Sequence, residues 1–116
     1  MQSESILQSI KKLLGIEPDY TYFDQDLIIH INSVLSILSQ IGFGPEEGFF
    51  VTGETETWDD LFDESNPQMQ LVKSYIYLKV RLMFDPPLNS TVINSINAQI
   101  AELEWRLNVV PSFNEE

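Results

Sequence analysis

The segment that ends just before Pro86-Pro87 constrains the fold more than any other part of the chain. Its apolar spacing predicts a helix that opens with Asn66 and Pro67 and stops before the double proline, because proline disfavours helix in the residue preceding it. This helix is expected to be either central in the fold or covered by another subunit, since it carries two apolar stripes. The first stripe is Met69, Val72, Ile76, Val80 and Met83, and the second is Leu71, Tyr75, Leu78 and Leu82.

Three other segments have the periodicity of amphipathic helices. Residues 5–14 form one, which Gly15 is expected to stop. A second covers residues 24–41, and the carboxylate of Asp24 is expected to cap its free backbone N–H groups. A third covers residues 89–107, with apolar side chains at alternating spacings of three and four, and is expected to pack antiparallel to the helix before it. The sequence therefore predicts a mainly α fold, a small bundle of three to four helices.

A long excursion, residues 42–66, separates the second of these helices from the one before the double proline. Glycine recurs in it, and it carries eight of the eighteen acidic side chains. Residues 49–57 are compatible with a short β-hairpin around Thr52-Gly53, and Thr57 is expected to cap a short turn that begins with Trp58. Loops of this length in compact domains are usually functional or disordered. A partner-binding loop and a flexible surface loop both fit the pattern.

The length of the chain, 116 residues, is enough for one domain with one core. We expect a single helical domain at residues 1–108, with the excursion as its irregular part. Residues 109–116 have no periodicity and end in acids, so a flexible C-terminal tail that orders on a partner is expected there.

Charge excludes several classes of partner. The formal net charge of −12 opposes binding to DNA, RNA or an anionic membrane surface. The chain has no cysteine, no apolar run of the roughly 20 residues that a membrane span requires, and no basic and apolar leader at its start. We expect a protein of the cytosol where it is made, with no membrane partner.

The sequence carries no recognisable motif for catalysis or cofactor binding. Neither a phosphate-binding glycine loop nor a zinc or calcium spacing is present. The lone histidine, His30, lies one helical turn after Asp26, a pair that can orient an imidazole, but a catalytic site needs further convergent groups. The paired acids Asp59-Asp60 could bind a hard cation or share a proton, but capping of a helix start accounts for them better. We expect no catalytic residue, no metal ligand, no cofactor and no enzymatic activity.

The chain resembles the head-tail connector family, the small adaptor proteins of tailed phages and prophages. The resemblance extends over nearly the whole sequence. It rests on LIIHINS at residues 27–33, GFGPEEGF at 42–49, KSYIYLKVRLMFDPP at 73–87 and IAELEWRL at 100–107.

The resemblance implies a subunit of a homo-oligomeric ring of about twelve copies. Such a ring would dock to the phage portal protein and offer a platform to tail or head-completion proteins, while DNA passes its lumen without specific binding. Assembly would occur in the host cytoplasm, and the assembled ring would lie at the head-tail junction of the virion.

Combined with the apolar pattern, this suggests a set of subunit or partner contacts. Trp58 fits a core position and an interface equally well, and Trp105 is expected in the core. The expected interface residues are Phe49, Phe50, Trp58, Leu71, Tyr75, Leu78, Leu82, Val109 and Phe113.

An alternative function is an acidic DNA mimic that inhibits a nucleic-acid enzyme. It is motivated by the net charge of −12 on a small chain. Mimicry requires carboxylates spaced along one face as phosphates are, whereas here eight of the eighteen acids are concentrated in residues 42–66.

Overall fold

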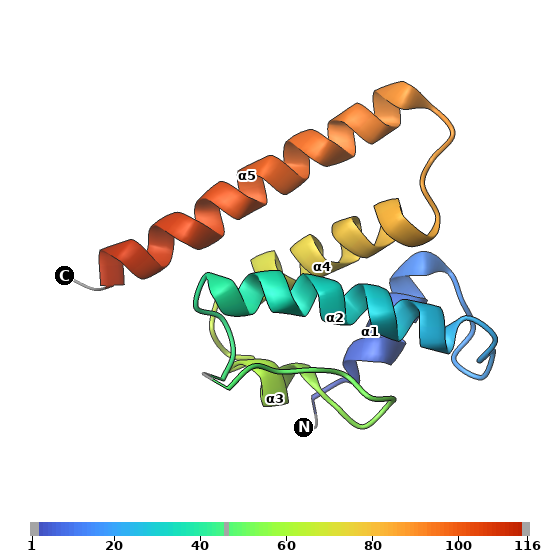
Figure 1. Ribbon diagram of the computed structural model, residues 1–116, viewed down its shortest axis with the longest axis horizontal. Coiled ribbons are helices and arrows are strands. Elements are labelled where there is room, and N and C mark those ends of the chain that lie inside the picture. Colours follow the sequence, from blue (N-terminus) through green and yellow to red (C-terminus); the bar gives the residue numbers. More distant parts are fainter. Residues whose placement is uncertain (1–2, 46, 115–116) are drawn as a thin grey trace.

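The computed structural model describes residues 3–45 and 47–114, with residues 108–114 described by their backbone alone. Its helices are α1 (Ile6–Leu14), α2 (Asp24–Gln40), α3 (Trp58–Leu61), α4 (Met69–Phe84) and α5 (Ser90–Asn114). Within the described residues no strand is formed, and the backbone pairs as an isolated antiparallel bridge between Ser5 and Thr57. The predicted mainly α fold is confirmed (Figure 1).

Helix α4 lies at the centre of the packing, since α1, α2 and α5 all pack against it (Figure 1). Four residues of its first stripe, Met69, Val72, Ile76 and Val80, are fully buried. Its second stripe faces α5, where Tyr75 Oη donates a hydrogen bond of 2.9 Å to Glu104, and Leu71, Leu78 and Leu82 of this stripe are partly buried. Of the two roles that the sequence allowed, α4 takes the central one.

The helix ends follow local chemistry at most of the predicted positions. Gly15 stops α1 in the left-handed conformation, with φ +83°, and its N–H donates to the carbonyls of the last turn. Thr57 caps α3 in a complete capping box with Asp60, and Asn89 Oδ1 accepts a 2.7 Å hydrogen bond from the backbone N–H of Thr91 at the start of α5. Helix α4 begins at Met69, later than predicted, because Asn66 and Pro67 form a turn ahead of it.

The structure differs from two sequence-based expectations and does not test a third. The β-hairpin over residues 49–57 is wrong, because Glu56 Oε2 accepts a hydrogen bond of 2.6 Å from the Thr52 hydroxyl and closes the turn without a ladder. The backbone of α5 continues past the predicted end at Leu107 as far as Asn114. The flexible tail at 109–116 stays a prediction, since the side chains there and residues 115–116 lie outside the described part of the chain.

The carboxylate of Asp24 does not cap α2, contrary to expectation, because it is used in an ion pair. Lys11 Nζ lies 2.9 Å from Asp24 Oδ1 and also donates a 3.0 Å hydrogen bond to the carbonyl of Pro18. The Lys11 side chain is fully buried, whereas that of Asp24 keeps 17% exposure. The pair therefore joins α1 to the start of α2 and fixes the loop between them.

Breaking this pair from the acidic side is expected to destabilise the fold strongly. Asp24→Ala leaves a buried ammonium without its counter-charge, which costs about 3 kcal/mol of unfolding free energy. The matched control Asp26→Ala removes an exposed acid from the same first turn and should cost less than about 1 kcal/mol. Urea denaturation of both variants measures the difference, and equal losses would show that the Lys11 pair contributes nothing.

Candidate interaction surfaces

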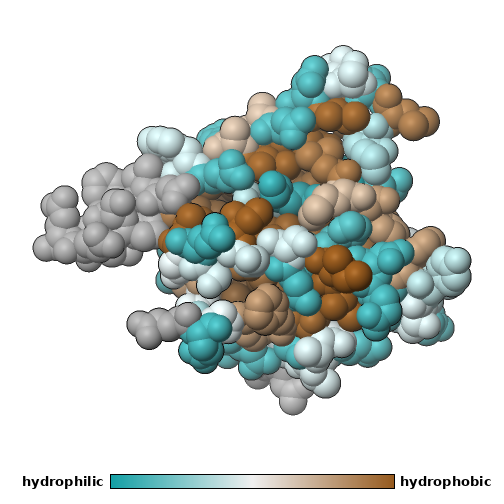
Figure 2. All heavy atoms as spheres, in the orientation of Figure 1, coloured by the Kyte–Doolittle hydropathy of each residue, from teal (hydrophilic) through white to brown (hydrophobic). Residues whose placement is uncertain are grey.

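Large apolar side chains stand exposed on several elements of the molecule. Figure 2 shows brown apolar side chains scattered among hydrophilic ones, including a group that projects where Figure 1 places the α4–α5 loop. The most exposed are Leu88 at 104%, Tyr22 at 76%, Trp105 at 66%, Ile29 at 61% and Phe50 at 58%. Exposed apolar and aromatic side chains of this kind suit contact with another protein.

The structure divides the predicted interface residues into three groups. Phe50 is exposed, and Phe49, Leu71, Leu78 and Leu82 are partly buried against the core. Trp58 and Tyr75 are fully buried, so in this fold they belong to the core of the chain itself. The side chains of Val109 and Phe113 lie outside the described residues.

Sequence reasoning misplaced one tryptophan and missed one isoleucine. Trp105 was expected in the core and is exposed, because it lies on the side of α5 opposite the seam of Ile96, Ile100 and Leu107. Ile29 lies off the buried stripe of α2 and is exposed, so it forms no second buried face of that helix. Its neighbours on the exposed side are serines, which the apolar pattern does not weigh.

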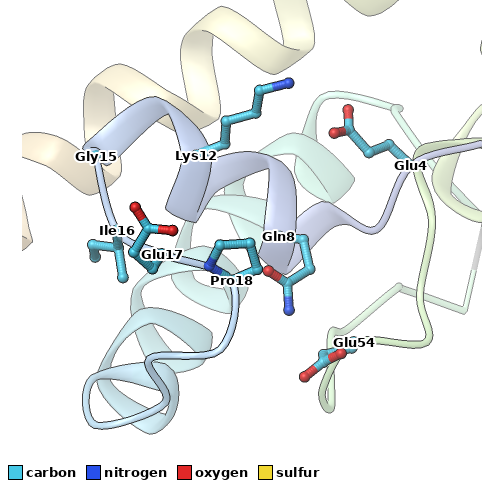
Figure 3. A pocket seen from close by; sticks show the side chains of 8 residues that line it. All are labelled: Glu4, Gln8, Lys12, Gly15, Ile16, Glu17, Pro18 and Glu54. Carbon is cyan, nitrogen blue, oxygen red and sulfur yellow. The ribbon is translucent and has the colours of Figure 1, made fainter.

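The surface has an open hollow of about 700 Å³, shown in Figure 3. Its lining residues are Glu4, Gln8, Lys12, Gly15, Ile16, Glu17, Pro18 and Glu54. It lies between α1, the α1–α2 loop and the tip of the excursion. Three of these side chains are carboxylates and one is an ammonium, so the hollow favours a basic group over an anion.

The excursion is held against the helices at two places. The side-chain amide of Asn32 accepts a hydrogen bond of 2.7 Å from the backbone N–H of Val51 and donates one of 3.0 Å to its carbonyl. Val51 is buried, and Phe50, which directly precedes it, is exposed. One residue of α2 thus fixes the backbone that presents Phe50.

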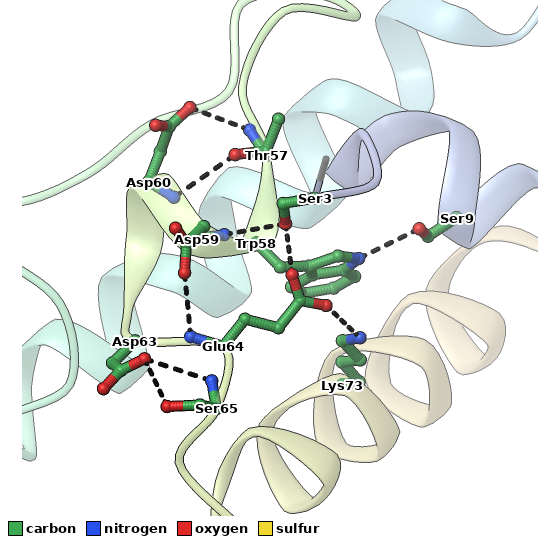
Figure 4. Close-up of polar contacts among 10 residues, drawn as sticks. All are labelled: Ser3, Ser9, Thr57, Trp58, Asp59, Asp60, Asp63, Glu64, Ser65 and Lys73. Atoms are coloured by element: carbon green, nitrogen blue, oxygen red, sulfur yellow. Dashed lines mark hydrogen bonds and ion pairs between the residues drawn. The ribbon is translucent and has the colours of Figure 1, made fainter. Parts of the chain in front are cut away.

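The second place is Trp58, at the start of α3 (Figure 4). Its indole Nε1 donates a 2.9 Å hydrogen bond to Ser9 of α1, and Lys73 of α4 lies 5.3 Å from its ring centroid. Lys73 Nζ in turn forms a 2.8 Å ion pair with Glu64, whose carboxylate also accepts a hydrogen bond from Ser3. These contacts join the excursion to α1 and α4, so the excursion is a fixed part of the domain.

The acids of the excursion are largely engaged in local hydrogen bonds. The hydrogen bond from Lys73, then that from Ser3, hold the pKa of Glu64 below its ordinary value. Burial alone would raise the pKa of Glu56, but hydrogen bonds from Thr52 and backbone N–H groups outweigh it and lower that pKa. Ser65 lowers the pKa of Asp63 in the same way. These three carboxylates therefore keep their negative charge to a lower pH than they would in an unfolded chain.

Metal and membrane chemistry find no support in the residues that the structure describes. His30 is partly buried on α2, and no group of three or more histidines and acids is arranged to hold a metal ion in that part of the chain. Nor does any described helix have the length and apolar character needed to cross a membrane.

Exposed apolar side chains on a mainly helical domain are typical of a protein that contacts other proteins. A family model described as phage connector protein matches residues 6–112. The chain belongs to the phage connector protein family, whose members are structural proteins of the head-tail junction of phage virions. Searches of the curated proteins and of the solved structures returned no match. The resemblance stated from the sequence is confirmed.

The Glu64–Lys73 pair should make stability depend on pH in a defined window. The pKa of Glu64 is lowered from its ordinary value of 4.5, so near that pH the folded chain binds fewer protons than the unfolded chain. The contribution is complete above about pH 4.5 and is lost as the pH falls through the folded pKa. Glu64→Gln and Lys73→Met should each be less stable than wild type at pH 7, by an amount that shrinks towards pH 3. Denaturation midpoints across this range test it, and a constant difference would contradict it.

Asn32 offers a second test, of the rigidity of the excursion. Asn32→Ala leaves two buried backbone groups of Val51 without partners, which costs about 1–3 kcal/mol locally. The Val51 amide should then exchange its hydrogen at least tenfold faster, as hydrogen-exchange NMR would measure. Asn97→Ala, an exposed position on α5, is the control. Unchanged exchange at Val51 would mean that other contacts hold the excursion.

Proposed function

We propose that this connector protein is a subunit of a ring that docks to the portal and offers its opposite side to tail or head-completion proteins. The observation that carries the proposal is the family match over residues 6–112, which covers nearly the whole chain. A ring of about twelve copies is proposed from the resemblance to the connector family, and heterologous contacts between neighbouring copies would close it. Assembly is proposed to occur in the host cytoplasm.

The exposed part of the excursion is our proposed docking surface for an adjacent component of the junction. Phe50 is exposed at 58%, and its backbone is fixed through Val51 and Asn32. An aromatic side chain presented by a rigid backbone loses little entropy on binding, which favours it as an anchor. The acids around it would prefer a partner surface with lysine and arginine. Phe49, partly buried beside it, would contribute to the same contact.

The negative charge has a second proposed role in the assembled ring. Each copy carries a formal net charge of −12, and a ring multiplies that charge around its axis. Carboxylates on a lumen wall repel DNA phosphates, so the genome would pass without being retained.

The DNA-mimic alternative receives no support from the family match. Its motivating observation, the net charge of −12, is accounted for by the proposed lumen. In the described residues the acids of the excursion accept hydrogen bonds from their own chain, as Glu56, Asp63 and Glu64 do. We therefore retain the connector proposal alone.

The test is association with the portal of the same phage. Light scattering coupled to size-exclusion chromatography should show wild-type protein co-eluting with the portal ring as a multi-copy complex. Phe50→Glu should weaken this association at least tenfold, whereas Leu13→Glu, which adds the same charge at an exposed apolar position of α1, should not. A wild-type chain that neither self-associates nor binds the portal at high concentration would overturn the proposal.

A further inference from the structure

Two long stretches of the chain carry no charge. Residues 27–45 and residues 86–101 contain no Asp, Glu, Lys or Arg, and they are the longest such stretches in the sequence. They stand out because 21% of all residues are charged and the net charge is −12. The first stretch contains most of α2, and the second contains the α4–α5 loop after Asp85 and about the first half of α5.

In the fold these stretches give α2 and α5 uncharged outer faces. Helix α2 buries Leu27, Ile31, Val34, Leu35 and Leu38. Its opposite side is exposed and consists of Ile29, Ser33, Ser36 and Gln40, at helical spacings of four, three and four. Ile29 is exposed at 61%, so the face has an apolar side chain at one end and small polar ones along the rest.

Helix α5 repeats this arrangement. Its buried residues face α4, and the side turned away from α4 consists of the exposed residues Thr91, Asn94, Ala98, Ala101 and Trp105. Trp105 is exposed at 66% and ends this face. The charged residues beside it interact within the chain. Arg106 forms an ion pair of 2.9 Å with Glu102, and Glu104 accepts a hydrogen bond from the Tyr75 hydroxyl.

The two faces are similar in chemistry, and the α5 face is the longer of the two. From Ile29 to Gln40 the α2 face extends about 16 Å, and from Thr91 to Trp105 the α5 face extends about 21 Å, at 1.5 Å per residue. Both helices pack on α4 (Figure 1), and the residues of both outer faces are exposed. The two faces are therefore different surfaces of one molecule, as a head-to-tail contact between copies requires.

Repulsion between identical acidic chains favours contact through these uncharged faces. Two copies each carrying −12 repel one another, and charges closer than the Debye length of about 8 Å at physiological salt are poorly screened. A contact made through uncharged faces brings few carboxylates together: Asp26 lies one turn before Ile29, and Glu102, beside Trp105, is paired with Arg106. It also buries two large apolar side chains that water otherwise surrounds.

We propose that the outer face of α5 in one copy packs against the outer face of α2 in the next copy. This inference rests on the proposed self-assembly and specifies its surface: Trp105 and Ile29 lie on opposite sides of the same heterologous interface. The portal and tail contacts are then made by other surfaces of the subunit, including the excursion.

The experiment uses one charge on each face. Trp105→Glu and Ile29→Glu should each abolish assembly of the full-length protein, measured by light scattering alone and on the portal, because a carboxylate would be buried without a partner. Both positions are exposed in the single chain, so circular dichroism should show wild-type helicity. Leu13→Glu, exposed at 53%, should assemble like wild type. Ala101→Glu repeats the test on the α5 face without removing a large side chain.

Mixing the two variants distinguishes a heterologous interface from a symmetric one. The Trp105→Glu chain keeps an intact α2 face, and the Ile29→Glu chain keeps an intact α5 face. An equimolar mixture should therefore form a heterodimer and nothing larger. A mixture that stays monomeric, with each variant also monomeric, would overturn the pairing of α5 with α2.

Trp105 also supplies a spectroscopic signal. It is exposed in the single chain whereas Trp58, the other tryptophan, is fully buried, so assembly should shift the emission to shorter wavelength and reduce quenching by acrylamide. Wild-type assembly without these changes would overturn the inference. So would variants that assemble as wild type does, and in both cases the proposed connector function would stand. Failure of wild type to assemble even on the portal would overturn both.

Discussion

The burial of α4 on two sides is the constraint on which the rest of the fold depends. Its first stripe requires α1 and α2, and its second stripe requires α5. Because Tyr75 is buried in that second contact, its hydroxyl needs a partner, and Glu104 supplies one. Burial, then this hydrogen bond and the charge of Glu104, raise the pKa of the Tyr75 hydroxyl, so it stays protonated and remains a donor at a pH where a free tyrosine would begin to ionise.

Local sequence rules predicted the helices well, because the signals act within a few residues. Gly15, Thr57 and Asn89 each perform the role that their residue type favours, with hydrogen bonds over two to four positions. The rules failed where a distant partner competed for the same group. Asp24 was expected to cap its own helix, but the buried Lys11 lies within ion-pair distance and takes the carboxylate. Nothing near Asp24 in the sequence signals that partner.

The same limit explains the predicted interface. Periodicity shows that a side chain must be covered, but it does not show whether the same chain or another one covers it. Tyr75 was an interface candidate because it lies on the second apolar stripe, and Trp58 fitted a core position and an interface equally well; the chain itself buries both. Trp105 was assigned to the core because it borders the seam of α5, although its helical position is opposite that seam. The surfaces that remain for partners are those where apolar side chains lie outside the periodic stripes.

These surfaces meet at α2, which connects the two proposed contacts. Asn32 holds the backbone beside Phe50, and Ile29, one turn earlier, lies on the outer face that would receive the next subunit. A force on the excursion is therefore transmitted to α2 through the two hydrogen bonds between Val51 and Asn32, and α2 is also the helix that would contact the next subunit. Since α2 is packed against α4 by fully buried residues, it has little freedom to shift between the two contacts. Rigid coupling of this kind suits a subunit that joins components above and below it, because each contact then presents the other in a fixed geometry.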